Sequence, residues 1–310
     1  MKSVSPQIQE NIKNFILEKL PYDRSNVDVS DHLKSRNALD LLRIFVSWKR
    51  RLISRHPRNV LKSAEFEALS REINRPAEIA KLVSEIRRGD DLTPRLSRGV
   101  KTGFSLPTSP TKKLGPRHRP DLDLLLNDWR VHHLHISNEI DTDGFVKRGN
   151  KLVFAIFNYY TVYLIGIFDH KSWASKNIVE IALKNWPDRR LFIELLGLLP
   201  GSDCTDDQRH QLRNSGCPTP IDIGNRVFFG TGKLTTAGTN WDYNRLASEI
   251  WQQIAWFEVQ LNINYDFIAN HWNTVGLKIP NKPRFSFAFF EHAYGFYEIE
   301  SDFFLKLGEI

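Results

Sequence analysis

The chain has 310 residues, of which 41% are hydrophobic and 25% are charged, a composition that excludes an extensively disordered protein and allows two or three domains with cores of their own. Its two cysteines, Cys204 and Cys217, form no CxxC pair and have no histidine at metal spacing beside them, so neither a disulfide framework nor a cysteine-based zinc site is supported. The formal charge of +7 is concentrated at one end: residues 1–120 hold 25 Lys and Arg against 13 Asp and Glu, whereas the remainder holds 18 against 23.

The first part of the chain, residues 1–93, is expected to be helical and basic. Apolar residues at helical spacing predict helices over about 8–20, 35–53 and 75–88. Gly89 directly follows the third of these segments, and glycine is the residue that most often ends a helix.

The positive charge of residues 1–120 indicates a partner that carries phosphates, because neutralising phosphates releases counterions and gives affinity without sequence readout. Residues 94–120 contain five prolines and no acidic residue, which predicts a linker or a functional loop that orders on nucleic acid. A solvated helix face and a flexible connector would have the same composition. The residues expected to contact nucleic acid are Lys49, Arg50, Arg51, Arg95, Arg98, Lys101, Lys112, Lys113, Arg117 and Arg119.

The central segment, residues 121–200, is expected to fold as a small α+β module. Its longest apolar run is shorter than the ~20 residues of a membrane helix and is rich in Val, Ile, Phe and Tyr, so it is interpreted as two strands, 151–157 and 161–168. Together with a strand over 129–137 they form an antiparallel sheet, and a helix over about 175–185 packs on one face.

The last third, residues 201–310, is expected to be mainly helical with short strands. A long amphipathic helix is predicted over about 244–261, and aromatic segments follow near 284–290 and 294–304. Their aromatic side chains offer a surface for a protein partner or a homodimer. The fold class predicted for the whole chain is α+β. The cysteine usage and an N-terminus without an apolar signal core predict a cytoplasmic protein that does not contact a membrane.

Three histidines of the central module are the candidate acid and base groups. Alternation along the first strand puts His133 and His135 on one face, and His170 follows the third strand. Because histidine titrates near neutrality, two of them flanking a phosphodiester can cleave RNA through its 2′-hydroxyl. His132 points to the opposite face of a regular strand and is not expected to share their site. The residues expected to hold the phosphate are Arg148, Lys151 and Lys171.

Two other roles are open for these histidines. A single histidine is often a hydrogen-bonded core or edge-strand residue. A His-x-His strand can also bind zinc, here through His133 and His135, with His170 or Asp169 as the third ligand. The surrounding basic side chains oppose a cation, so we expect a site without metal and a protein without a cofactor.

Three aliphatic strands with Arg130 at their start and Leu164-Ile-Gly-Ile-Phe-Asp-His-Lys171 at their end resemble those of the RelE/ParE-like toxins and of the barnase and EndoU-type ribonucleases. In that group a small antiparallel sheet with a packed helix cuts RNA without metal. The resemblance covers about residues 121–187 and implies a RelE-like fold with a toxin or defence role. The residues that it implies are Arg148 and Lys151 on phosphate, and His170 and Lys171 as acid or base.

Functions from several classes remain open. The leading hypothesis is a metal-independent ribonuclease of toxin or phage-defence type. The pair His135-Ile-Ser137 and His170-Lys-Ser172 also resembles the motifs of two-histidine phosphoesterases. A nucleic-acid-binding regulator without catalysis would use the same sheet as a platform, and a protein-interaction module would use the aromatic C-terminal region.

Overall fold

The computed structural model of the chain describes residues 4–107, 119–201, 204–274, 276 and 283–309. Its contacts divide it into two compact units, one formed by Met1–Arg50 with Tyr243–Ile310 and the other by Arg51–Asp242. Helices and small sheets occur in both units, which confirms the predicted α+β class. The units do not divide near residues 93 and 200, as the sequence led us to expect, because the segment after Arg51 contributes a strand and two helices to the central sheet and its cover.

A four-stranded mixed sheet forms the centre of the Arg51–Asp242 unit, with the strand order β1-β4-β3-β2. The strands are β1 (Asn59–Lys62), β2 (Val131–His135), β3 (Lys151–Phe157) and β4 (Thr161–Asp169). The expected antiparallel arrangement holds for β2, β3 and β4, and β1 joins β4 in parallel. The sequence predicts only helices in the region that contains β1, because a strand of four residues is too short to establish an alternating pattern.

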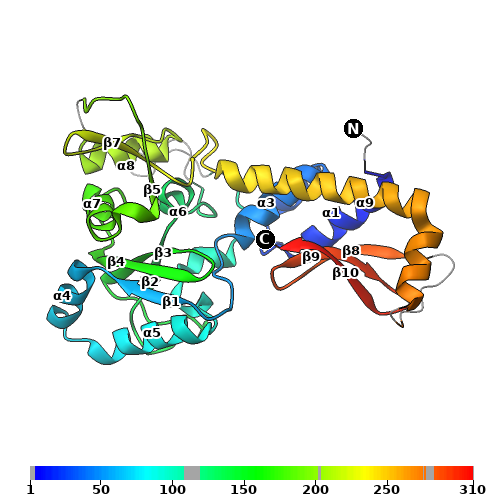
Figure 1. Cartoon of the computed structure of the whole chain (residues 1–310), viewed down its shortest axis with the longest axis horizontal. Helices are drawn as coiled ribbons and strands as arrows, with labels where there is room; N and C mark the ends of the chain where they lie inside the picture. Colours follow the sequence, from blue (N-terminus) through cyan, green and yellow to red (C-terminus); the bar gives the residue numbers. More distant parts are fainter. Residues whose placement is uncertain (1–3, 108–118, 202–203, 275, 277–282, 310) are drawn as a thin grey trace. The chain divides into compact units, whose positions relative to one another are not determined.

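Apolar side chains cover both faces of this sheet. One cluster, around Leu134, packs against α4 (Ala64–Glu72) and α5 (Pro76–Arg88). A second cluster, around Phe154, packs against α7 (Lys176–Asn185). Figure 1 shows α4 and α5 on one side of the sheet and α7 on the other. Strands that are buried on two faces have nearly continuous apolar sequences, which explains the long apolar run that contains β3 and β4.

Helix α5 has the termini that its sequence predicts. Pro76 is in its first turn, and Gly89 follows its last residue with a φ of 77°. A Cβ at Gly89 would also lie 2.2 Å from the carbonyl carbon of His56. Any other residue at this position would therefore combine an unfavourable backbone conformation with a collision.

The described residues of this unit also form a second, three-stranded sheet and two short helices. The strand order is β5-β7-β6, with β5 (Phe192–Glu194), β6 (Ile221–Ile223) and β7 (Arg226–Gly230). The helices are α6 (Leu124–Trp129) and α8 (Asp206–Asn214), and the 3-10 turns are Thr93–Arg95, Arg98–Lys101 and Pro187–Arg189. The buried side chains of helix α8 are two arginines, Arg209 and Arg213, so its sequence has no row of apolar residues at helical spacing. Hydrophobic periodicity therefore gave no signal for it.

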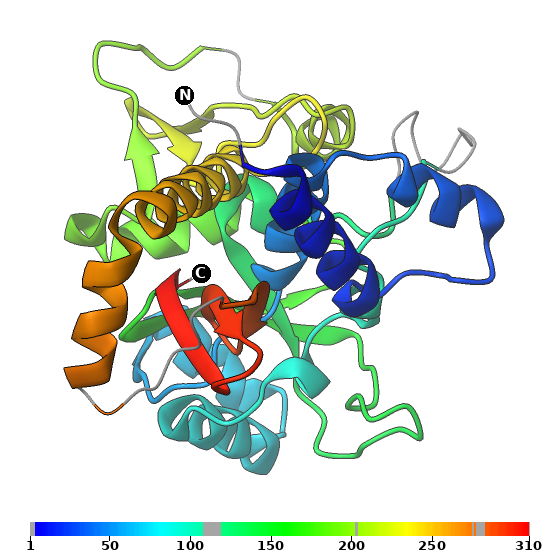
Figure 2. The same cartoon turned by 90° about the vertical axis from the view of Figure 1, so that its right-hand side faces the viewer.

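The other unit combines helices with a three-stranded antiparallel sheet of order β10-β9-β8. Its elements are α1 (Pro6–Lys19), α2 (Val27–Lys34), α3 (Ala38–Lys49), most of α9 (Trp241–Thr274), β8 (Phe285–Phe290), β9 (Ala293–Glu298) and β10 (Phe303–Glu309). The ring of Phe15 on α1 lies 5.9 Å from that of Phe45 and 6.0 Å from that of Phe289, so α1 packs against α3 and β8. Helix α9 loses helical geometry at Asn264 and bends, as Figure 2 shows. None of the described helices combines the length and the apolar character needed to cross a membrane.

Candidate active site

A cavity of about 500 Å³ lies in the Arg51–Asp242 unit, beside the outer strand β2. This volume is typical of a pocket for a small ligand. Among the described residues, seven stretches of the chain line it, namely Arg51, residues 96–100, residues 119–125, His132 with His133, Trp173, residues 210–216 at the end of α8, and residues 236–238. Since these stretches are far apart in the sequence, only the fold brings them together.

Two neighbouring histidines of β2 both line this cavity. They lie on opposite faces of the strand: the ring of His133 is 4.7 Å from that of Trp173, and the ring of His132 is 5.3 Å from that of Phe157. Because β2 is the outer strand of its sheet, a cavity beside its edge meets both faces. The expectation that His132 cannot share a site with His133 is therefore wrong.

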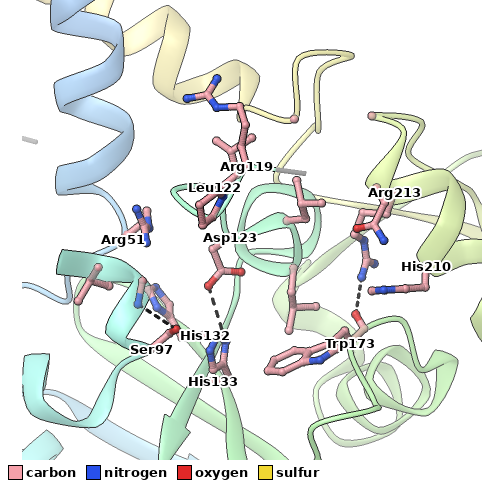
Figure 3. Close-up of a pocket in the computed structure, with 18 of the residues that line it drawn as sticks. Arg51, Ser97, Arg119, Leu122, Asp123, His132, His133, Trp173, His210 and Arg213 are labelled. Atoms are coloured by element: carbon pink, nitrogen blue, oxygen red, sulfur yellow. Dashed lines mark hydrogen bonds and ion pairs between the residues drawn. The ribbon is translucent and has the colours of Figure 1, made fainter. Parts of the chain in front are cut away.

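His133 is paired with a carboxylate. Its Nδ1 lies 3.6 Å from Oδ2 of Asp123, and Figure 3 shows the two side chains pointing toward each other. Asp123 is the N-cap of α6, and its Oδ1 accepts a hydrogen bond of 3.0 Å from the backbone N–H of Leu126, which fixes the direction of the carboxylate. At 3.6 Å the pair is longer than a hydrogen bond. Nδ1 is enclosed and has no hydrogen-bond partner among the described residues, and His133 as a residue lines the cavity.

Arg51 is on one wall of the cavity and is only 5% exposed. Its Nη1 donates to the carbonyl oxygens of Thr102 and Asp121, at 2.8 and 2.7 Å. The sequence predicts a helix that continues to about residue 53, and this is wrong because α3 ends at Lys49, before Arg51. The chain then turns inward, and the guanidinium group holds two loops together.

Arg213 is on the other side of Asp123, as Figure 3 shows, and is 2% exposed. Its Nε donates to Oδ2 of Asp128 at 2.8 Å, and a second N–H donates to the carbonyl oxygen of Trp173. Its guanidinium group also stacks over the ring of Trp129 at 4.2 Å. An ion pair, a carbonyl and an aromatic face thus hold Arg213 in a single orientation.

Trp173 connects the cavity to the other candidate histidines. The ring of His170 lies 5.7 Å from Trp173 and 5.8 Å from His135. Burial is the main cause that lowers the pKa of His133 and His135, and the nearby Arg148 guanidinium contributes to both shifts, so these side chains share one electrostatic neighbourhood. The fold thus brings the three predicted catalytic histidines and one predicted phosphate ligand together. Of the three, His133 is the one that lines the cavity as described.

Burial keeps the β2 histidines neutral at neutral pH. It lowers the pKa of His132 and of His135 to about 4. It also lowers the pKa of His133, although the Asp123 carboxylate acts in the opposite direction. A neutral imidazole with one nitrogen held toward a carboxylate is able to accept a proton at the other, so His133 has the properties of a general base.

Arg95 has a structural role instead of the expected role in nucleic-acid binding. It is 2% exposed, forms an ion pair with Glu85, and donates to the carbonyl oxygens of residues 135–137 at 3.1–3.2 Å. It thereby joins the end of β2 to α5. Because each of its three guanidinium nitrogens already has an acceptor within the protein, Arg95 has no donor left for a phosphate.

Other expected nucleic-acid contacts are engaged by nearby acids. Arg98 pairs with Asp141 and Asp143 at 2.5 and 2.7 Å, and Lys101 pairs with Asp143 at 3.1 Å. Arg119 pairs with Asp121 at 2.5 Å, although it also lines the cavity. Their segment contains no acid of its own, but the fold supplies acids from beyond it. The net charge of residues 94–120 taken alone is therefore more positive than the surface that these residues form in the structure.

The remaining predicted basic residues differ in exposure. Burial of Lys49 lowers the pKa of its amine, whereas Arg50 and Lys171 are exposed. Lys151 forms an exposed ion pair of 3.0 Å with Asp169. Three further predicted contacts, Lys112, Lys113 and Arg117, lie outside the described residues.

The alternative of a zinc site at His133 and His135 is not supported by the part of the chain that the structure describes. No group of three or more His, Cys, Asp or Glu side chains in those residues is arranged to hold a metal ion. His133 lies beside Asp123, and His135 lies beside His170.

Sequence reasoning missed Asp123, His210 and Arg213 as residues of the site. A signal existed for Asp123, because an Asp directly before an apolar run is a typical helix N-cap. No local signal marks Arg213, since its ion-pair partner Asp128 is 85 residues away in the sequence. Comparison of the chain with family models, with curated proteins and with solved structures found no match, so no relative assigns a role to any of these residues.

Proposed function

We propose that this protein is a metal-independent ribonuclease and that His133, oriented by Asp123, is its general base. The observation that carries the proposal is the pairing of these two side chains at the wall of a cavity that is also lined by Arg51, Arg119 and Arg213. A base, a group that orients it, and several donors for phosphate oxygens are the parts that cleavage of RNA through its 2′-hydroxyl requires.

In this reaction Nε2 of His133 takes the proton of a 2′-hydroxyl, whose oxygen attacks the adjacent phosphorus. The bond from phosphorus to the 5′-oxygen of the next nucleotide breaks, which leaves a 2′,3′-cyclic phosphate and a 5′-hydroxyl. Asp123 stabilises the imidazolium that forms, and the arginines stabilise the added charge on the phosphate oxygens. The leaving oxygen takes its proton from water, because burial keeps His132 neutral and therefore unsuited to act as an acid.

The pair of His135 and His170 supports a second candidate, a two-histidine phosphoesterase. Their rings lie 5.8 Å apart, close enough to flank one phosphodiester, and Nε2 of His170 is 3.2 Å from the carbonyl oxygen of Gly149. The chemistry is related, but the base would be a different residue. Variants of single histidines therefore separate the two candidates.

The test uses the full chain, EDTA and an end-labelled, single-stranded RNA of mixed sequence. We expect cleavage to products with a 2′,3′-cyclic phosphate, and a loss of about a thousandfold or more in His133→Gln. The matched control is His56→Gln, because His56 stacks on Tyr159 and is not among the residues that line the cavity as described.

Each other outcome has a definite meaning. Loss of cleavage in His135→Gln and His170→Gln, with His133→Gln fully active, supports the two-histidine candidate. RNA that is bound but not cut by the wild-type protein supports the regulator. RNA that is neither bound nor cut by the wild-type protein overturns the ribonuclease and the regulator alike. The cytoplasmic location stays a prediction. The toxin or defence role also stays a prediction, and growth arrest on induced expression would test it.

A further inference from the structure

Two buried arginines of the cavity each retain a hydrogen-bond donor without a partner. Nε of Arg51 and Nη2 of Arg213 are enclosed and find no acceptor among the described residues. Buried polar groups are nearly always hydrogen-bonded, so an unpartnered N–H on a residue that lines a cavity indicates an acceptor that the chain does not supply, either a water or a ligand atom.

Both guanidinium groups are held in place without that acceptor. Arg51 is fixed by the carbonyl oxygens of Thr102 and Asp121, and Arg213 by Asp128 and the ring of Trp129. Side chains that are already fixed lose little conformational entropy when a ligand binds. Burial lowers the pKa of both groups, and an anion beside either would favour its charged form.

The two donors are on opposite sides of the His133–Asp123 pair, as Figure 3 shows. The lining of the cavity is mixed, and its apolar part includes Leu122, Leu125 and Trp173. Such a surface suits a sugar and a base. The volume of about 500 Å³ matches one nucleotide unit with its phosphates and is far too small for a double helix.

We propose that this cavity binds one unpaired nucleotide with a phosphate on each side, one phosphate contacting Arg51 and the other Arg213. The proposal deepens the ribonuclease function and rests on it for the reaction, but the binding does not require turnover. It predicts that the enzyme acts on single-stranded or looped-out nucleotides and not on a continuous duplex.

Calorimetry with the full chain tests the binding. The probes are adenosine 3′,5′-bisphosphate, adenosine 3′-monophosphate and adenosine, none of which has a following nucleotide that could leave. We expect the bisphosphate to bind about tenfold or more tightly than the monophosphate, because two arginines are engaged in place of one. In Arg51→Met this advantage should disappear.

Removal of Arg213 alone would leave Asp128 buried without a partner and would risk unfolding. The variant for this side is therefore the double change Arg213→Met with Asp128→Asn, and its folding is checked by circular dichroism and thermal melting. The matched control is Arg55→Met, since Arg55 forms an exposed ion pair with Asp91. Folded variants that keep the wild-type preference for the bisphosphate would overturn the proposal, as would a bisphosphate that binds no better than adenosine.

The two proposals fail in different ways. A bisphosphate that binds through both arginines, combined with an absence of RNA cleavage, supports the subsite and contradicts the ribonuclease. His133-dependent cleavage without binding of the bisphosphate supports the ribonuclease and contradicts the subsite. Equal cleavage of a loop and of a continuous duplex contradicts the subsite even if the reaction is confirmed.

Discussion

Asp123 and His133 face each other across 3.6 Å although one is the cap of a helix and the other lies in the middle of a strand. The chain between them reverses at Arg130, whose φ of 57° lies in the left-handed region. This residue ends α6 and leads directly into β2. The pairing of acid and base therefore depends on one unusual backbone conformation between two short elements.

Asp123→Asn should impair the reaction while preserving the fold. Asparagine caps helices about as well as aspartate, so the melting temperature should change little. The loss of the carboxylate should lower kcat about a hundredfold or more, because the imidazolium of His133 is no longer stabilised. Since Asp123 raises the pKa of His133, the acidic limb of the pH–rate profile should also move to lower pH. An unchanged profile with normal kcat would exclude Asp123 as a partner of the base.

Acid should destabilise the protein through the buried histidines. The pKa of His132 falls from 6.5 to about 4 on folding, so the unfolded chain binds more protons between these values. Its contribution to stability is complete above pH 6.5 and is lost as the pH falls toward 4, at most about 3 kcal/mol. His132→Phe cannot titrate, and the free energy of unfolding, measured by denaturant titration at several pH values, should fall less steeply for it. Parallel curves for the two proteins would contradict this assignment.

Arg95→Met should weaken the fold much more than loss of a surface cation would. Glu85, whose side chain is only 15% exposed, would be left without its partner, and three carbonyl groups at the end of β2 would lose a donor. Removal of one member of a buried ion pair typically costs about 3–5 kcal/mol. Arg55→Met is the control, since its exposed pair with Asp91 should contribute less than about 1 kcal/mol. Denaturant unfolding measures both, and equal losses would show that Arg95 is not a structural residue.

Gly230→Ala should disturb the wall of the cavity that holds Arg213. A Cβ at Gly230 would lie 2.2 Å from the carbonyl oxygen of Asp128, so the backbone of α6 would have to move. We expect a loss of about 2 kcal/mol in the free energy of unfolding and weaker binding of adenosine 3′,5′-bisphosphate. Gly149→Ala is the matched control, because a Cβ there meets nothing within 4 Å. If both variants behave like the wild type, this contact does not position Asp128.

Sequence patterns were sufficient for the elements that are long and periodic. The expected helices over 8–20, 35–53 and 75–88 correspond to α1, α3 and α5, and the two central strands correspond to β3 and β4. These segments repeat an apolar residue often enough to reveal a period. The short strand β1 and the arginine-rich helix α8 lacked such a repeat, so they appeared only in the structure.

The sequence by itself determined the α+β class, the central strands and a set of three candidate histidines, His133, His135 and His170. Only the tertiary structure decided which groups surround that histidine, because Arg51 and Arg213 reach its cavity from segments far away in the chain. It also decided which basic residues are buried or paired. Arg51 and Arg95 are buried, and Arg98 pairs with acids some forty residues further along the chain. The physical reason is that charge and burial depend on which surfaces meet, and the order of residues within one segment does not specify a contact between distant segments.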